Sequence, residues 1–288
     1  MHAPEWFKRV APPVVAGILY GVAGAQRRGV LENQRVVRGQ RSWWREHRDA
    51  YEVFAQFARS MTEGFEQWGP HPRQLDVRLI DADVFENALA EGRGLVTVTG
   101  HFGSWEIAAR TLSRLARPLN MVTAHEINPS VRDFVHDVRT RHGYRVIYSD
   151  QGLLAGLPIL QALRRHEIVG LQLEPWGPKR GSHEVVFCGR RTRFQLGPFA
   201  VARVARAPIV PVFAVRRGIR AYDLRVGRRF DPRTPEESVR ALEETVAAYE
   251  ALVREVPEQW LMFQDVWPAA QERDAEPDDA VRTRSSVA

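Results

Sequence analysis

Residues 95–106 read Leu-Val-Thr-Val-Thr-Gly-His-Phe-Gly-Ser-Trp-Glu. The aliphatic and β-branched run at 95–99 predicts a buried strand. Gly100 and Gly103 flank His101 and permit a tight turn, and Ser104 is a favoured residue at the N-terminus of a helix. The stretch therefore predicts a strand, a turn and a helix, which is the repeating unit of an α/β fold.

The turn places a histidine and a carboxylate together. A neutral histidine can remove a proton near neutral pH, and a nearby carboxylate can hold the ring in the required tautomer. We therefore predict that Glu106 folds back toward His101 and that both are catalytic. The structural alternative is that Ser104 caps the helix and Glu106 only complements its dipole.

The same histidine–acid spacing occurs twice more, at His47 with Glu52 and at His71 with Asp76. Positions five apart on a helix lie about 140° apart around the axis, so the first pair would not meet. His71 lies between two prolines in an expected turn. Context thus favours the pair at His101.

Strand and helix signals alternate on both sides of this stretch. The expected strands are 95–99, 119–123, 145–148, 168–173, 184–187, 209–216 and 221–226, the last as an antiparallel edge. The expected helices are 107–115, 130–142, 156–165, 198–206 and 235–256. The pattern predicts an α/β fold with a mostly parallel central sheet flanked by helices. Sites in such folds lie beyond the carboxyl ends of the strands, where His101 falls.

The chain divides into three parts. Residues 1–69 read as a helical segment, 70–267 as the α/β core, and 268–288 as a disordered polar tail. The apolar run 11–25 is short for a membrane span and contains two prolines and three glycines. It is flanked by a cluster of aromatic and basic residues, Trp6, Phe7, Lys8, Arg9, Arg27 and Arg28. It either lies in a membrane interface or packs on the domain.

Composition narrows the function classes. The 288 residues carry a net charge of +6, which suits anionic partners such as phospholipid surfaces or acidic carrier proteins. We expect no nucleic-acid partner, since no nucleic-acid-binding module is visible. The single cysteine, Cys188, excludes an internal disulfide and is expected to be a buried strand residue. We expect no metal or other cofactor, and the G-x-S-x-G elbow of serine hydrolases is absent.

Several blocks occur in an order that resembles a known family. They are 28–33 (Arg-Gly-Val-Leu-Glu-Asn), 94–106, 139–143 (Arg-Thr-Arg-His-Gly), 169–182, 187–216 and 257–267. Together they resemble the lipid A biosynthesis lauroyl/myristoyl acyltransferase family, a branch of the glycerolipid acyltransferase group. Two positions depart from that family. Glu174-Pro175 stands where the family usually reads Asp-Gln, and the strand at 121–126 lacks a frequent arginine.

The resemblance implies transfer of a fatty acyl chain from a thioester, on acyl carrier protein or coenzyme A, to a hydroxyl of a lipid or glycolipid. A lipid A-type acceptor is favoured, as in lipopolysaccharide biosynthesis. His101 would be the general base of the H-x4-E motif, and Glu106 would orient it. The backbone amides of Phe102, Gly103 and Ser104 would hold the oxyanion. The expected substrate-binding residues are Arg139, Arg141, Glu174, Lys179, Arg180 and Arg216.

A thioester donor made in the cytosol and a single cysteine favour a peripheral location on the cytoplasmic face of the inner membrane. Two other functions stay open at this point. In an acyl-thioester hydrolase, water would replace the acceptor hydroxyl. A non-catalytic binder of anionic membranes or nucleic acid would fit the basic charge, but it would leave residues 100–106 unexplained.

Overall fold

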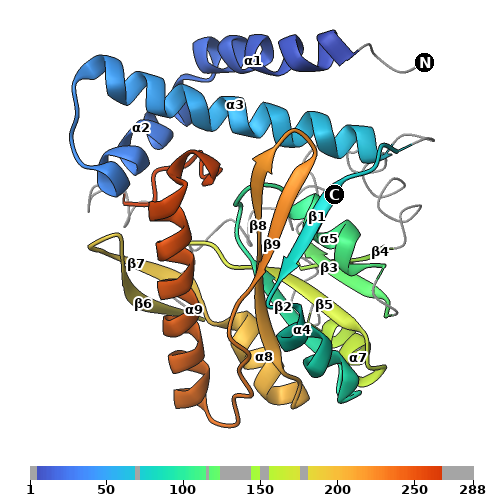
Figure 1. Ribbon diagram of the computed structural model, residues 1–288. Helices are drawn as coiled ribbons and strands as arrows, with labels where there is room; N and C mark the ends of the chain where they lie inside the picture. The colour runs from blue at the N-terminus through green and yellow to red at the C-terminus, as the bar shows by residue number, and fades with distance from the viewer. Residues whose placement is uncertain are drawn as a thin grey trace, which may run out of the picture.

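The computed structural model describes residues 5–68, 72–114, 117–123, 144–149, 156–175 and 181–267. Within these ranges, a helical N-terminal segment packs on an α/β core (Figure 1). The mixed α/β class and the helical N-terminal segment are therefore confirmed. The helix expected at 130–142 and the tail from 268 onward lie outside the described residues.

Three helices form the N-terminal segment: α1 (Glu5–Val22), α2 (Gly24–Arg38) and α3 (Trp43–Trp68). They share a small apolar core in which Val30, Val53 and Phe54 are buried. The long helix α3 crosses the end of the central sheet, and α1 packs on its outer side (Figure 1). Within the described ranges, no helix combines the length and apolar character needed to cross a bilayer.

The central sheet has seven strands in the order β1-β9-β8-β2-β5-β3-β4. Their bounds are β1 (Asp76–Ile80), β2 (Leu95–Thr99), β3 (Leu119–Thr123), β4 (Tyr144–Tyr148), β5 (Ile168–Gln172), β8 (Ile209–Gly218) and β9 (Ala221–Val226). The strands β8, β2, β5, β3 and β4 are parallel neighbours, whereas β9 pairs antiparallel with β8. The sequence missed β1, which pairs parallel with β9, so β9 is not the edge. The half-exposed β1 carries polar residues that weaken its strand signal.

Helices cover both faces of the sheet. They are α4 (Ala82–Ala90) and α5 (Trp105–Leu112) on one face, and α7 (Gly156–Arg164), α8 (Gly197–Ala205) and α9 (Pro235–Glu255) on the other. Each face of the sheet has its own apolar core, and the side chains of β2 alternate between the two. Leu95 packs with α4 and α5, whereas Val96 and Val98 pack with α7, α8 and α9. Burial on both faces explains why β2 reads as a continuous apolar run.

A two-stranded antiparallel hairpin, β6 (Ser182–Phe187) and β7 (Arg190–Gln195), stands beside the main sheet. Cys188 is buried as expected, but it lies in the hairpin turn with φ +53° and not in a strand. The sequence missed β7 because its exposed arginines give it little apolar character. Burial raises the pKa of Cys188 to about 12, so its thiol stays protonated.

Candidate active site

The turn between β2 and α5 depends on its two glycines. A Cβ atom at Gly103, where φ is +58°, would lie 1.8 Å from the carbonyl oxygen of Ala214. A Cβ atom at Gly100 would lie 2.3 Å from the hydroxyl oxygen of Tyr249. Because neither contact tolerates a side chain, both glycines are needed to bring the turn against its neighbours, which fixes the backbone of His101.

The carboxylate that contacts His101 belongs to Glu174. Its Oε1 atom lies 2.6 Å from Nδ1 of His101 and also accepts the backbone N–H of His101 at 2.9 Å. The side-chain amide of Gln172 lies 3.3 Å from the other ring nitrogen, Nε2. A carboxylate at Nδ1 favours the tautomer that carries its proton there, which leaves the Nε2 lone pair as the base.

The pKa of His101 depends on its burial and on the charge of Glu174. Burial alone would lower the pKa of His101, but the negative charge of Glu174 and its hydrogen bond outweigh burial and raise the pKa above its usual value. The ring is still accessible, since 41% of the side-chain surface is exposed. Glu174 thus stabilises the imidazolium that forms when His101 accepts a proton.

A cavity of about 530 Å³ lies beside the turn, and His101, Glu106 and Glu174 all line it. Its other walls are α3 and the segment 261–264, which contribute mostly apolar side chains: Phe57, Met61, Phe65, Leu261, Met262 and Phe263. The prediction that His101 and Glu106 share a site at the end of a central strand fits this placement. Glu174 makes the Nδ1 contact that the sequence assigned to Glu106, so the orienting role of Glu106 stays a prediction.

Two of the three predicted oxyanion donors already have partners within the protein. The amide of Phe102 donates to the carbonyl of Gly100 at 2.7 Å, and the amide of Gly103 donates to the carbonyl of Gln259 at 2.9 Å. Both donors are used to build the turn. Ser104, at the N-terminus of α5, remains the predicted donor of the three, because amide groups and the helix dipole favour negative charge there.

Arg216 has a different environment from the one expected. Its guanidinium bonds Glu63 of α3, with Nη2 2.7 Å and Nε 3.2 Å from Oε1. Only 10% of the Arg216 side chain and 8% of the Glu63 side chain are exposed. Tyr222 donates to the second oxygen of Glu63 at 2.5 Å. This arrangement favours a structural role for Arg216, joining α3 to the sheet, over the predicted substrate contact.

The four remaining predicted substrate-binding residues, Arg139, Arg141, Lys179 and Arg180, lie outside the described residues. Sequence reasoning missed Gln172. The sequence marks Gln172 only by its position at the end of an expected strand. That strand, β5, pairs with β2 and places Gln172 opposite Thr99. Because strand order is not visible in the sequence, that neighbourhood could not be read in advance.

Comparison with known proteins identifies the family of the chain. Residues 9–268 match the family of bacterial lipid A biosynthesis acyltransferases. The chain is also 30% identical over 223 residues to a phosphatidylinositol mannoside acyltransferase of Mycolicibacterium smegmatis, covering 75% of this chain and 71% of that protein. A phosphatidylinositol mannoside acyltransferase of Mycobacterium tuberculosis is 27% identical over 199 residues, covering 68% of this chain and 62% of that protein. The protein therefore belongs to the bacterial lipid A biosynthesis acyltransferase family and is an acyltransferase.

Proposed function

We propose that the protein transfers a fatty acyl chain from a thioester to a hydroxyl of a phosphate-bearing glycolipid, with His101 as general base. The observation that carries this proposal is the Glu174 carboxylate 2.6 Å from Nδ1 of a cavity-lining histidine. This arrangement prepares Nε2 to accept a proton. General-base assistance of this kind raises rates by about 10²–10⁴-fold.

The reaction balances without a covalent acyl-enzyme. Nε2 of His101 removes the proton of the acceptor hydroxyl while its oxygen forms a bond to the thioester carbonyl carbon. The carbonyl becomes an oxyanion, held at the N-terminus of α5 by the Ser104 amide. When the C–S bond breaks, the carbonyl re-forms and the thiolate leaves. The thiolate takes the proton from His101, which regenerates the neutral base.

The acceptor we favour carries both sugar hydroxyls and phosphate. The relatives named above are phosphatidylinositol mannoside acyltransferases, and the family is named for lipid A biosynthesis. Both lipids combine those groups. The relatives named above favour a mannosylated phosphatidylinositol over a lipid A precursor. The basic residues Arg139, Arg141, Lys179 and Arg180 remain the proposed phosphate contacts, and Glu106 keeps its proposed orienting role beside His101.

The donor is an acyl thioester on acyl carrier protein or coenzyme A. The apolar wall that α3 presents to the cavity, with Phe57, Met61 and Phe65, suits an acyl chain. Because this wall lies beside His101, a chain bound against it would hold the thioester within reach of the base. Substituting Met61→Trp should then shift the preference toward shorter acyl chains, as a competition between donors of different length would show.

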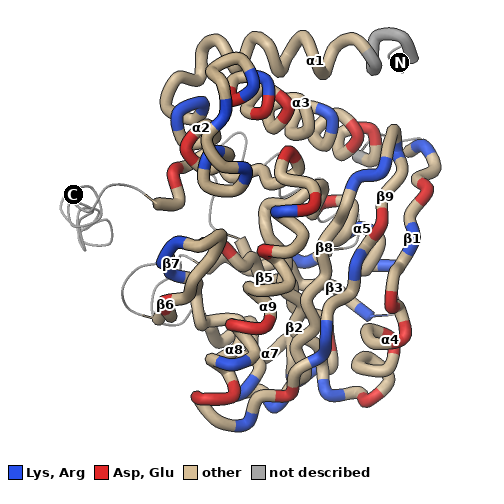
Figure 2. Tube along the Cα trace, turned by 60° about the vertical axis from the view of Figure 1, so that its left-hand side comes forward, with Lys and Arg blue, Asp and Glu red and all other residues tan. Residues whose placement is uncertain are grey.

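We place the protein at the cytoplasmic face of the membrane as a peripheral enzyme. Helix α1 carries an exposed apolar stripe at four-residue spacing, Val10, Val14, Ile18 and Val22. Trp43 and Trp44 are exposed at the start of α3. Figure 2 shows the part of α1 from Val10 to Val22 as a run without charged residues, beside the basic positions of α2. An apolar face next to basic residues suits an anionic bilayer surface.

Flotation with liposomes tests this surface. The variant Val14→Glu/Ile18→Glu should lose binding to anionic vesicles. The matched control Val204→Glu, which changes an exposed apolar residue on α8, should bind like the wild type. Equal flotation of all three proteins would contradict the membrane role of α1.

The central experiment incubates the purified enzyme with acyl-coenzyme A or acylated carrier protein and each acceptor lipid. The acylated lipid and free fatty acid are then quantified. His101→Ala should remove nearly all acyl transfer, whereas His183→Ala, a histidine of the β6–β7 hairpin paired with Glu243, should retain it. Free fatty acid that forms at the same rate with and without acceptor would instead identify a hydrolase. Substantial transfer by folded His101→Ala would contradict the proposed base.

A further inference from the structure

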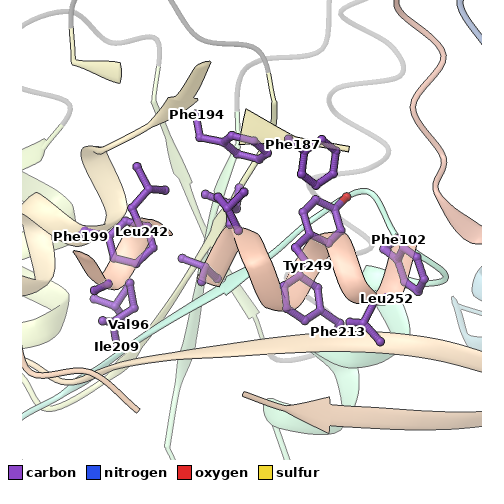
Figure 3. Packing of buried hydrophobic residues seen from close by; sticks show 14 of the residues in the cluster. Val96, Phe102, Phe187, Phe194, Phe199, Ile209, Phe213, Leu242, Tyr249 and Leu252 are labelled. Atoms are coloured by element: carbon purple, nitrogen blue, oxygen red, sulfur yellow. The ribbon is translucent and has the colours of Figure 1, made fainter. Parts of the chain in front are cut away.

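One buried hydroxyl close to His101 has no part in the mechanism so far. Tyr249 lies on α9 and is fully buried. Its ring stacks on Phe213 at a centroid distance of 5.1 Å and meets Phe187 at 5.8 Å and Phe102 at 6.2 Å (Figure 3). A phenylalanine would fill the same apolar space. Packing therefore does not explain why this ring carries a hydroxyl.

The hydroxyl is directed at the catalytic turn. A Cβ atom at Gly100 would lie 2.3 Å from the Tyr249 oxygen. The phenol oxygen therefore packs directly against the backbone of Gly100, in space that a side chain at this position would occupy. Gly100 is joined directly to His101, whose N–H donates to Glu174 Oε1. The phenol oxygen and the Glu174 carboxylate are thus both held close to the Gly100–His101 peptide.

Three polar atoms around this peptide are buried. They are Oε2 of Glu174, the hydroxyl of Tyr249 and the indole nitrogen of Trp260, and none completes a hydrogen bond of good geometry within the described residues. Trp260 is held between two backbone bonds, from Gly103 to Gln259 and from Leu261 to His101. The Glu174 oxygen is an anionic acceptor, the Trp260 indole nitrogen is a donor, and the Tyr249 hydroxyl can both donate and accept. Buried polar atoms are normally satisfied, so these three are expected to serve one another.

We propose that Tyr249 is a positioning residue whose hydroxyl donates to Glu174 Oε2, directly or through one water, so that Tyr249, Glu174 and His101 form a relay. Trp260 supports the relay by directing its indole N–H at the phenol oxygen. The relay holds the carboxylate in the orientation that its bond to Nδ1 of His101 requires. The kinetic part of this inference rests on the proposed acyl transfer.

The charges around the phenol agree with a donor role. Burial and the charge of Glu174 raise the pKa of Tyr249 well above its usual value, so the phenol stays protonated. The nearby indole N–H of Trp260 acts in the opposite direction and lowers the pKa of Tyr249, and Cys188 of the hairpin turn is the other titratable neighbour. Cys188 is itself neutral, since burial raises its pKa to about 12. Around His101, Glu106 of α5 shares the cavity with Glu174.

The test replaces Tyr249 with phenylalanine. Loss of the donor leaves the Glu174 carboxylate more basic, which raises the pKa of His101 further. Tyr249→Phe should lower kcat about tenfold, leave KM within twofold, and move the acidic limb of the pH–rate profile upward. The matched control is Tyr222→Phe, which removes another buried tyrosine hydroxyl from a glutamate, Glu63. It should lower stability without moving the profile.

A second measurement does not depend on turnover. NMR titration of the His101 ring in the unliganded enzyme should show a higher pKa in Tyr249→Phe than in the wild type. Should that variant not fold, 3-fluorotyrosine at position 249 keeps shape and hydroxyl but donates more strongly, and should lower the His101 pKa. An unchanged His101 titration would overturn the relay whether or not the enzyme transfers acyl groups. A shifted titration without acyl transfer would instead count against the proposed function alone.

Discussion

Removing Glu63 tests how α3 is attached to the core. Glu63 receives two bonds from the Arg216 guanidinium and one from the Tyr222 hydroxyl. The side chains of Glu63 and Arg216 are 8% and 10% exposed, so water cannot replace the lost partner. Glu63→Ala therefore leaves a buried positive charge without compensation.

The magnitude follows from that burial. Breaking a buried ion pair by removing one partner costs about 3–5 kcal/mol. An orphaned buried hydroxyl at Tyr222 belongs to the class that costs about 1–3 kcal/mol. We expect Glu63→Ala to lower the free energy of unfolding by about 5 kcal/mol, the upper end of the range for the ion pair. The two costs do not add in full, because relaxation around the site recovers part of each. Glu63→Met/Arg216→Met should recover much of the loss, because apolar side chains of similar size need no partner.

Urea unfolding followed by tryptophan fluorescence measures these differences. The matched control is Glu244→Ala, which breaks the exposed pair with Arg228 and should cost less than about 1 kcal/mol. Initial rates at varied acceptor concentration separate the two roles of Arg216. A loss below about 1 kcal/mol for Glu63→Ala, combined with a large rise in acceptor KM for Arg216→Met, would refute the structural reading and restore the substrate contact.

Three further predictions concern the site and its support. Because a charged His101 cannot act as a base, kcat/KM should rise with pH through a midpoint above the usual pKa of histidine. Glu174→Gln should move that midpoint downward, and an unchanged midpoint would show that Glu174 does not raise the pKa of the base. Gly29→Ala should lower the free energy of unfolding, since its Cβ would lie 2.4 Å from a backbone oxygen of the C-terminal segment, whereas Gly17→Ala, with open space around it, should not. Buried Cys188, with a pKa of about 12, should resist iodoacetamide at pH 8 until the protein is unfolded, as mass spectrometry would show.

Local sequence patterns predict the individual strands and helices of the core. The run at 95–99 forms β2, and the strands expected at 119–123 and 221–226 have the expected bounds. Helix α9 begins at the expected Pro235, where Thr234 and Glu237 form a capping box. These features depend on residues close together in the chain, through apolar periodicity, turn glycines and caps. The ordered family blocks likewise indicated the acyltransferase family that the comparisons confirm.

Which side chains contact one another depends on how the elements pack in three dimensions. Glu174 reaches Nδ1 of His101 because β5 pairs with β2, an order of strands that no local pattern encodes. Arg216 is neutralised by Glu63, which lies 153 positions away on a helix that crosses the end of the sheet. The amides of Phe102 and Gly103 are consumed by bonds that build the turn. A sequence lists the groups that can carry charge and hydrogen bonds, but their partners are set by strand order and helix docking, which depend on long-range packing.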